Sequence, residues 1–291
     1  MPERILITGA TGTSGYYTIR PLVDFGGNDE IIAGVRKIDQ AKEKLSEFET
    51  LNYCQFDFED PSTFESALDG ISLMYLLRPP HISNVQKDFS PLVKCAKDAG
   101  VRGIVFLSVQ GAEKSKVIPH RKIEILIEES GIPYVFLRPG YFMQNLTNEL
   151  IDDIQAKNKI IIPAGDAKFN WIDGMDIGQA SARILMDFDK HSEKVYNLTG
   201  TEQINFNEVA GMISDITGRK IEYESPGLIR YYRMKKKQDI PRAKIIVMMM
   251  IHFLPRIQSQ SPLSDDLKSI TGKNPITLDD FIKREKEKFL R

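Results

Sequence analysis

An apolar run at the start of the chain leads directly into three evenly spaced glycines. Ile5–Thr8 is followed by Gly9, Gly12 and Gly15, and Tyr16–Asp24 continues with a helical pattern. Continuous apolar character is typical of a buried strand in a parallel sheet. Glycines in the turn that follows permit a tight bend, close approach of a pyrophosphate and close packing of the helix. Because the free amides and dipole of a helix start attract anions, the motif predicts dinucleotide binding by Gly9, Thr11, Gly12, Thr13, Ser14 and Gly15.

Strand and helix patterns alternate through the first half of the chain. Parallel strands need crossover helices, so this alternation predicts an α/β fold of the Rossmann type, with a doubly wound parallel sheet over residues 1–140. The expected strands after the first are Glu30–Arg36, Asn52–Asp57, Ser72–Arg78, Arg102–Val109 and Tyr134–Arg138. The expected helices between them are Gln40–Phe48, Pro61–Leu68, Val85–Ala99 and His120–Ser130.

The pattern loosens over residues 141–291. We expect late Rossmann elements there and a smaller mixed subdomain that binds substrate, since ligands of open α/β sheets lie outside the carboxyl ends of the strands. The readable helices are Gln144–Lys157, Met175–Met186 and Phe206–Thr217, and the readable strands are Ile160–Ile162 and Val195–Leu198. The remainder, from Lys220 to Arg291, reads as a mixed tail without repeats.

The overall charge and the cysteines limit the classes of partner. Acids and bases nearly balance at a net charge of −1, which predicts no nucleic-acid partner and no anionic-membrane partner. Cys54 and Cys95 lie in apolar-patterned segments and are interpreted as small buried side chains in a reducing compartment, with no disulfide and no metal. The first strand leaves no room for a signal peptide, so we expect a cytoplasmic protein acting on a small molecule.

The ends of the later strands supply the remaining candidate contacts. Arg36 and Lys37 stand where an acidic residue would bind a ribose 2′-hydroxyl, so Arg36 predicts preference for NADP(H), with NAD(H) as the weaker cofactor. A solvated basic pair is the alternative interpretation. Asp57 is expected near the adenine. The residues at the ends of the later strands are expected near the nicotinamide ribose and ring; they are Leu77, Arg78, Ser108, Gly140 and Tyr141.

The catalytic group is harder to identify. Between Ser108 and Tyr134 there is no Tyr-x-x-x-Lys pair, in which the lysine lowers the tyrosine pKa. Tyr231 and Lys235 have that spacing but are interpreted as chance in a lysine-rich stretch. His120 is the candidate proton donor because imidazole titrates near neutrality, and Glu124, one turn on, is expected to orient the ring. The alternative is a helix-start histidine that makes ordinary cap contacts.

One later segment, Ile245–Leu254, is apolar on every face and about half the length that spans a bilayer. A fully buried helix is the favoured interpretation. Contact with the substrate, with a second subunit or with a protein partner is the alternative, because methionines adapt to varied shapes. The C-terminal segment is therefore the candidate surface for a homodimer or another protein.

Taken together, the chain resembles the NmrA-like branch of the atypical short-chain dehydrogenase/reductases. The matching residues are Thr8–Gly15, Val35–Arg36, Leu107–Ala112, His120, Glu124, Glu129–Tyr134, Leu137–Gly140 and Phe142–Asn145. That family contains NADPH-dependent quinone reductases, isoflavone-type reductases and NADP-sensing regulators with little or no catalysis. The resemblance implies the fold and the cofactor more than the reaction. The leading hypothesis is NADPH-dependent reduction of a small planar carbonyl, quinone or enone. A non-catalytic NADP(H) sensor is the second hypothesis, and a nucleotide-sugar epimerase is a distant third.

Overall fold

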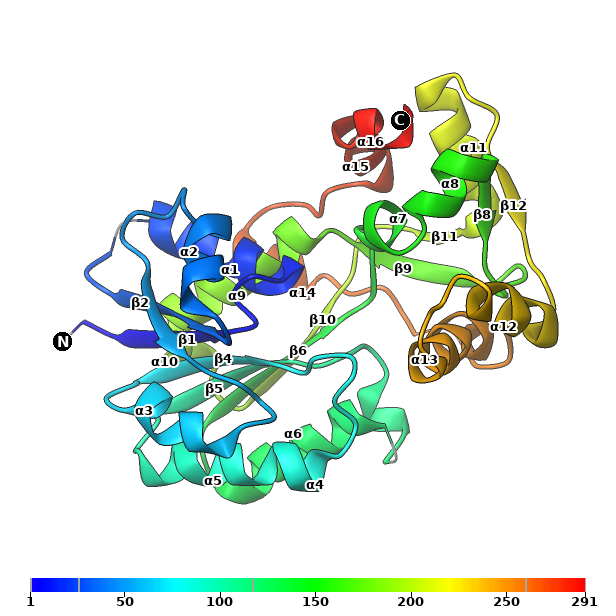
Figure 1. Ribbon diagram of the computed structural model, residues 1–291. Helices are drawn as coiled ribbons and strands as arrows, with labels where there is room; N and C mark the ends of the chain where they lie inside the picture. Colours follow the sequence, from blue (N-terminus) through cyan, green and yellow to red (C-terminus); the bar gives the residue numbers. More distant parts are fainter. Residues whose placement is uncertain (1, 26, 117, 260, 291) are drawn as a thin grey trace. The chain divides into compact units, whose positions relative to one another are not determined.

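A computed structural model describes residues 2–25, 27–116, 118–259 and 261–290, which form two compact units (Figure 1). The first unit comprises Met1–Pro139, Gly174–Leu198 and Asp265–Asn274. The second comprises Gly140–Asp173, Thr199–Ser264 and Pro275–Arg291. Residues after 140 therefore contribute to both units. Met1, Gly26, Val117, Gln260 and Arg291 lie outside the described residues.

A seven-stranded sheet forms the centre of the first unit, in the order β10-β6-β5-β4-β1-β2-β3. Every adjacent pair is parallel. This confirms the expected Rossmann-type α/β fold, because the strand order extends in both directions from β1 and β4. The strands are β1 (Arg4–Thr8), β2 (Glu30–Val35), β3 (Asn52–Gln55), β4 (Leu73–Leu77), β5 (Gly103–Leu107), β6 (Tyr134–Pro139) and β10 (Lys194–Leu198).

Helices cover both faces of this sheet (Figure 1). One face carries α1 (Thr13–Asp24), α2 (Ile38–Lys44), α9 (Gly174–Met186) and α14 (Asp266–Thr271). The other face carries α3 (Phe64–Leu68), α4 (Val85–Asp88), α5 (Ser90–Asp98) and α6 (Pro119–Ser130). Between the second set and the sheet lies a buried apolar cluster with Phe89, Phe106 and Phe136 among its members. The short elements η1 (Pro61–Thr63), η2 (Ala112–Lys114) and α10 (Phe188–His191) complete the unit.

Two expected helices are interrupted. The segment expected as one helix over Val85–Ala99 is two, because Pro91 lacks an amide proton and its ring opposes an unbroken helix through Phe89. Similarly, the Gln144–Lys157 segment forms α7 (Asn145–Asn148) and α8 (Ile151–Lys157). Asparagine and threonine side chains in α7 favour local turns over a continuous helix.

The second unit contains two small sheets and a set of helices around its own apolar core. In the three-stranded sheet, β9 pairs parallel with β7 and antiparallel with β11, so the sheet is mixed as expected. Its strands are β7 (Tyr141–Phe142), β9 (Lys168–Ile172) and β11 (Gln203–Asn205), and the two-stranded sheet holds β8 (Lys159–Ile161) and β12 (Glu222–Glu224). Besides α7 and α8, its helices are α11 (Phe206–Thr217), α12 (Leu228–Lys236), α13 (Arg242–Phe253), η3 (Leu254–Arg256), α15 (Leu278–Arg284) and α16 (Lys286–Leu290).

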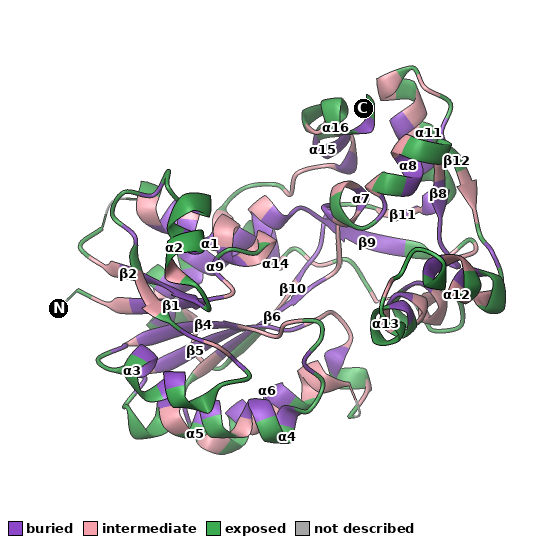
Figure 2. Cartoon of the chain, viewed as in Figure 1, coloured by how far each residue is buried: buried purple, intermediate pink, exposed green. Residues whose placement is uncertain are grey.

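The apolar segment 245–254 forms most of α13 and is not a fully buried helix. Ile245, Met248 and His252 face the core, whereas Ile246 and Met250 are 41% and 48% exposed. Figure 2 shows both buried and exposed stretches on this helix. The expectation of burial on every face is wrong because apolar composition does not determine how many sides of a helix are covered. Throughout the described part of the chain, no helix is both long enough and apolar enough to cross a membrane.

Candidate cofactor-binding site

The glycine loop between β1 and α1 has the geometry that the sequence predicts. Gly9 has a φ of +61°, and its carbonyl oxygen accepts a hydrogen bond of 2.9 Å from the amide of Gly12. A β-carbon on Gly15 would lie 2.4 Å from that same oxygen, so only glycine fits there. The helix α1 begins at Thr13 with no side-chain cap and no acidic residue in its first turn. The first amides of α1 are therefore available to an anion.

The loop is open to solvent at its tip. Thr11 and Gly12 are exposed, and Thr13 and Ser14 are half-buried. An exposed, uncapped helix start next to a glycine cradle fits a pyrophosphate, because the dipole favours negative charge and no β-carbon prevents close approach. The residues present thus fit a dinucleotide.

The parallel sheet brings the other strand-tip candidates to the same edge. In the sheet order, β2 and β4 flank β1, and β5 and β6 follow β4. Residues that immediately follow these strands therefore lie beside the glycine loop or further along the same edge. Leu77 contacts the loop directly, since a β-carbon on Gly9 would lie 2.6 Å from its side chain.

Arg36 and Asp57 lie on the β2 and β3 side of the loop. Arg36 is exposed directly after β2 and, within the described chain, has no side-chain partner. Its guanidinium remains available to a phosphate. Asp57 has a local role, because its carboxylate accepts a hydrogen bond of 3.0 Å from the amide of Glu59 and its own amide donates to Thr63.

At the ends of β5 and β6, Glu124 joins a buried charged network. Its side chain is fully buried, and its oxygens accept hydrogen bonds from Ser108, Arg121 and Arg138 at 2.7 to 2.9 Å. Arg138 contacts both oxygens and also pairs with Glu113. Despite burial, which opposes ionisation, these donors hold the pKa of Glu124 below its usual value.

This network corrects the expected role of Glu124. A carboxylate offers about four lone-pair positions, and Ser108, Arg121 and Arg138 occupy them. The prediction that Glu124 orients His120 is therefore wrong. The network itself was missed, although a charged residue closing the apolar run Val135–Leu137 was a visible signal for a buried ion pair.

His120 instead lies beside Arg78. The Nε of Arg78 is 3.4 Å from Nε2 of His120, and the same guanidinium donates to the carbonyl oxygens of Pro79 and Pro80. Burial, together with the positive charge of Arg78, lowers the pKa of His120 to about 3. The ring is therefore neutral at pH 7, and the expectation that it titrates near neutrality is wrong. Because a guanidinium only donates, Nε2 is the acceptor and Nδ1 carries the proton.

A second buried histidine, His252, makes the acid sensitivity of the protein testable. Burial lowers its pKa to about 4. In the unfolded chain both His120 and His252 would titrate near pH 6.5, so their contribution to stability is present above that pH and is lost as the pH falls. The free energy of unfolding should fall by up to about 1.4 kcal/mol per pH unit for each histidine between pH 6.5 and the folded-state pKa.

Urea unfolding at a series of pH values checks this expectation. The variant His252→Gln should have a shallower slope of unfolding free energy against pH, whereas His81→Gln, at an exposed site, should retain the parent slope. Equal slopes for His252→Gln and the parent protein would contradict the assignment.

Gly140 and Tyr141 follow β6 in the chain and belong to the second unit. A β-carbon on Gly140 would lie 2.2 Å from the carbonyl oxygen of Asn170 in β9. The ring of Tyr141 packs among Phe169, Trp171 and Phe206, and its hydroxyl lies 2.8 Å from Nε2 of His252. Both residues thus have clear structural partners, and cofactor contact by either stays a prediction.

Tyr231 and Lys235, whose spacing resembles a catalytic pair, are both buried inside the second unit. The Nζ of Lys235 lies 2.8 Å from a carboxylate oxygen of Asp153. Burial raises the pKa of the Tyr231 hydroxyl, with Asp153 adding to the effect. A lysine committed to a carboxylate does not lower a tyrosine pKa, so this pair has the wrong electrostatics for proton transfer at neutral pH.

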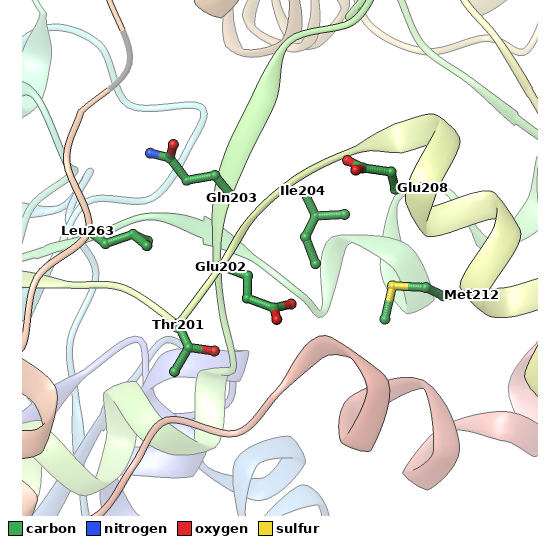
Figure 3. A pocket seen from close by; sticks show the side chains of 7 residues that line it. All are labelled: Thr201, Glu202, Gln203, Ile204, Glu208, Met212 and Leu263. Atoms are coloured by element: carbon green, nitrogen blue, oxygen red, sulfur yellow. The ribbon is translucent and has the colours of Figure 1, made fainter.

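A surface hollow lies in the second unit, and none of the residues that line it is a predicted site residue (Figure 3). One of its carboxylates, Glu208, accepts a hydrogen bond from the amide of Asn205 in the capping box of α11. The lining includes two glutamates and no lysine or arginine, so it does not suit a phosphate group. Its lining residues are Thr201, Glu202, Gln203, Ile204, Glu208, Met212 and Leu263.

A family model and several known proteins are similar to this chain over most of its length. A family model described as the NmrA-like family matches residues 1–254. The chain is 28% identical over 279 residues to Prestalk A differentiation protein A of Dictyostelium discoideum, covering 96% of this chain and 91% of that protein. It is 27% identical over 288 residues to NAD(P)H azoreductase of Xenophilus azovorans, covering 96% of each chain.

Two further similarities concern a quinone reductase and a dye reductase. The chain is 28% identical over 224 residues to quinone oxidoreductase 2 of Escherichia coli, covering 76% of this chain and 77% of that protein. It also matches the crystal structure of Citrobacter sp. triphenylmethane reductase complexed with NADP(H). That match has a TM-score of 0.83 and 25% identity, and it covers 97% of this chain and 99% of that one.

Proposed function

The chain belongs to the NmrA-like family, and from this premise we propose that it is an NADP(H)-dependent reductase of a small planar carbonyl, quinone or enone. The observation that carries the proposal is the glycine loop leading into the uncapped start of α1, with Arg36 exposed directly after the neighbouring strand β2. The names of three relatives, an azoreductase, a quinone oxidoreductase and a triphenylmethane reductase, support a conjugated electron acceptor.

The proposed role of each site residue follows from the chemistry of its side chain or backbone. The amides of Thr13, Ser14 and Gly15 at the start of α1 bind the pyrophosphate, and the guanidinium of Arg36 binds the 2′-phosphate with charge-assisted hydrogen bonds. A bound nicotinamide coenzyme supplies the hydride. Arg138 positions the carboxylate of Glu124, which accepts a hydrogen bond from the hydroxyl of Ser108 and thereby fixes the residue that follows β5.

His120 serves in this proposal as a neutral hydrogen-bond donor through Nδ1, or as a relay for a proton from solvent. With its pKa near 3, it does not provide an imidazolium in the ligand-free protein. We therefore expect His120→Ala to reduce turnover by about 100-fold, at the lower end of the usual effect of positioned proton donors.

A panel of quinones, enones, azo dyes and simple aldehydes tests the proposed activity with NADPH. Oxidation is followed by the loss of the reduced nicotinamide absorbance. We expect turnover with at least one conjugated acceptor and none with simple aldehydes. Tight coenzyme binding without oxidation by any acceptor would contradict the reductase.

That second outcome would favour a non-catalytic NADP(H)-sensing regulator. The sensor is supported by the lack of obvious proton donors: within the described residues, the first unit offers no Tyr-x-x-x-Lys pair. In addition, His120 is neutral because its pKa is lowered. Unequal affinities for the oxidised and reduced coenzyme, measured by calorimetry, would give such a sensor its signal. An epimerase has no support from the site.

Arg36 allows the choice of coenzyme to be tested separately. Replacing Arg36 with Ala removes charge-assisted hydrogen bonds of about 1.5 to 3 kcal/mol, so NADPH should bind roughly 10-fold to 100-fold more weakly. Affinity for NADH, which lacks the 2′-phosphate, should change little. Calorimetric titration of both coenzymes measures the difference, with exposed Lys37→Ala as the matched control. Equal losses for NADPH and NADH would contradict the assignment.

A further inference from the structure

Positive charge is concentrated in one stretch of the second unit. Residues 228–256 contain eight lysines and arginines and a single acidic residue, Asp239, in a chain whose net charge is −1. This stretch forms α12, α13 and η3, which follow one another and pack together (Figure 1). The balanced net charge, which predicts no anionic-membrane partner, therefore conceals a strongly basic region.

Both helices turn one side inward to the same apolar core. Tyr231 of α12 and Met248 of α13 belong to that core, and Ile245 and His252 are buried on the same side of α13. The opposite sides of the two helices consequently face away from the core. We call these outward sides the α12–α13 face.

The α12–α13 face combines cations with aliphatic side chains. On α12 and just after it, Arg233, Lys236 and Lys237 are exposed, and Ile229 is 72% exposed. On α13 the positions opposite the buried side are apolar. They are Ala243, Ile246 and Met250.

Part of the positive charge is already paired. Arg230 contacts Glu224 at 2.7 Å, and Lys244 contacts Glu149 at 2.9 Å. Within the part of the chain that the structure describes, no ion pair forms at Arg233, Lys236, Lys237 or Arg242. Four exposed cations thus remain available to an external partner.

We propose that the α12–α13 face binds peripherally to the anionic headgroup surface of a phospholipid bilayer. Basic side chains beside exposed aliphatic ones are the composition of helices that lie in a membrane interface. The cations would contact acidic lipid headgroups, and Ile229, Ile246 and Met250 would enter the boundary between headgroups and acyl chains.

Charge and composition disfavour other occupants. A second copy would bring two basic faces together, and like charges in an isologous interface repel. A nucleic acid would satisfy the cations but would leave the exposed isoleucines and methionine without apolar contact. An acidic protein is the remaining competitor and becomes an outcome of the test.

Flotation of the full chain with lipid vesicles tests the proposal. We expect the protein to float with phosphatidylcholine vesicles that contain phosphatidylserine and not with phosphatidylcholine alone. Raising the salt concentration should release it, because salt screens surface charge. The double variant Lys236→Gln/Lys237→Gln should bind more weakly by roughly five-fold for each charge removed.

Two further variants separate lipid binding from simple charge attraction. Ile246→Gln/Met250→Gln should also weaken vesicle binding, and since both residues are exposed the variant should fold normally. The matched control Lys268→Gln/Lys273→Gln, at exposed positions in and just after α14, should bind like the parent protein. Equal flotation with and without phosphatidylserine would overturn the proposal. So would polyglutamate binding as tight as vesicle binding with no effect of the apolar variant, which would instead indicate an acidic protein partner.

Discussion

Replacing Gly15 with alanine should weaken NADP(H) binding by at least about 100-fold. The new β-carbon would lie 2.4 Å from the carbonyl oxygen of Gly9 and 2.7 Å from the α-carbon of Ala10. Both atoms are backbone, so no side chain can rotate away and the loop itself must move. Because the Gly9 oxygen also accepts the Gly12 amide, displacement of the loop misplaces the amides that would bind the pyrophosphate.

Calorimetric titration of NADPH measures this loss, with circular dichroism to verify folding. Gly211→Ala is the matched control, because Gly211 lies inside α11 and, apart from its chain neighbours and the backbone of its own helix, no atom lies within 4 Å of the added carbon. It should bind coenzyme normally and gain about 0.5 to 1 kcal/mol of stability. If a folded Gly15→Ala protein bound NADPH within ten-fold of the parent, the glycine loop would not be the pyrophosphate site.

The second large effect is expected at Arg138. Replacing Arg138 with Met should lower the free energy of unfolding by about 3 to 5 kcal/mol, because it leaves the fully buried carboxylate of Glu124 without its two-oxygen partner. Ser108 and Arg121 still donate to Glu124 but do not replace that contact. The double variant Arg138→Met/Glu124→Leu should regain most of the loss, since no uncompensated charge remains.

Urea unfolding followed by far-ultraviolet circular dichroism measures these differences. Fluorescence of Trp171, the single tryptophan, reports separately on the second unit. Glu113→Gln is the control, because Glu113 is exposed and pairs with the same arginine, so its removal should cost about 0.5 kcal/mol. A loss below about 1 kcal/mol for Arg138→Met would contradict the importance of the buried pair.

The parallel sheet and the glycine loop could be predicted from sequence because their signals are local. The run Ile5–Gly15 contains its own strand, turn and helix start, and the later apolar runs repeat the pattern. The positive φ of Gly131, at the end of α6, likewise agrees with the expected helix end.

Contacts between distant residues could not be predicted in the same way. The bonds from Glu124 to Ser108 and Arg138 join positions 16 and 14 residues apart on three different elements. Helical spacing placed Glu124 one turn from His120, but the stronger attraction of a two-oxygen contact with Arg138 determined its orientation. The lowered pKa of His120 likewise depends on Arg78, 42 residues earlier in the chain.

The placement of Asp265–Asn274 in the first unit has a consequence for biosynthesis. A carboxylate oxygen of Asp266 accepts a hydrogen bond of 2.7 Å from the amide of Asn197 in the edge strand β10. The first unit is thus incomplete until residues 265–274 have left the ribosome, and it cannot reach its final form before they do. A stop codon shortly after residue 254 would therefore impair the first unit as well as the second unit that it truncates.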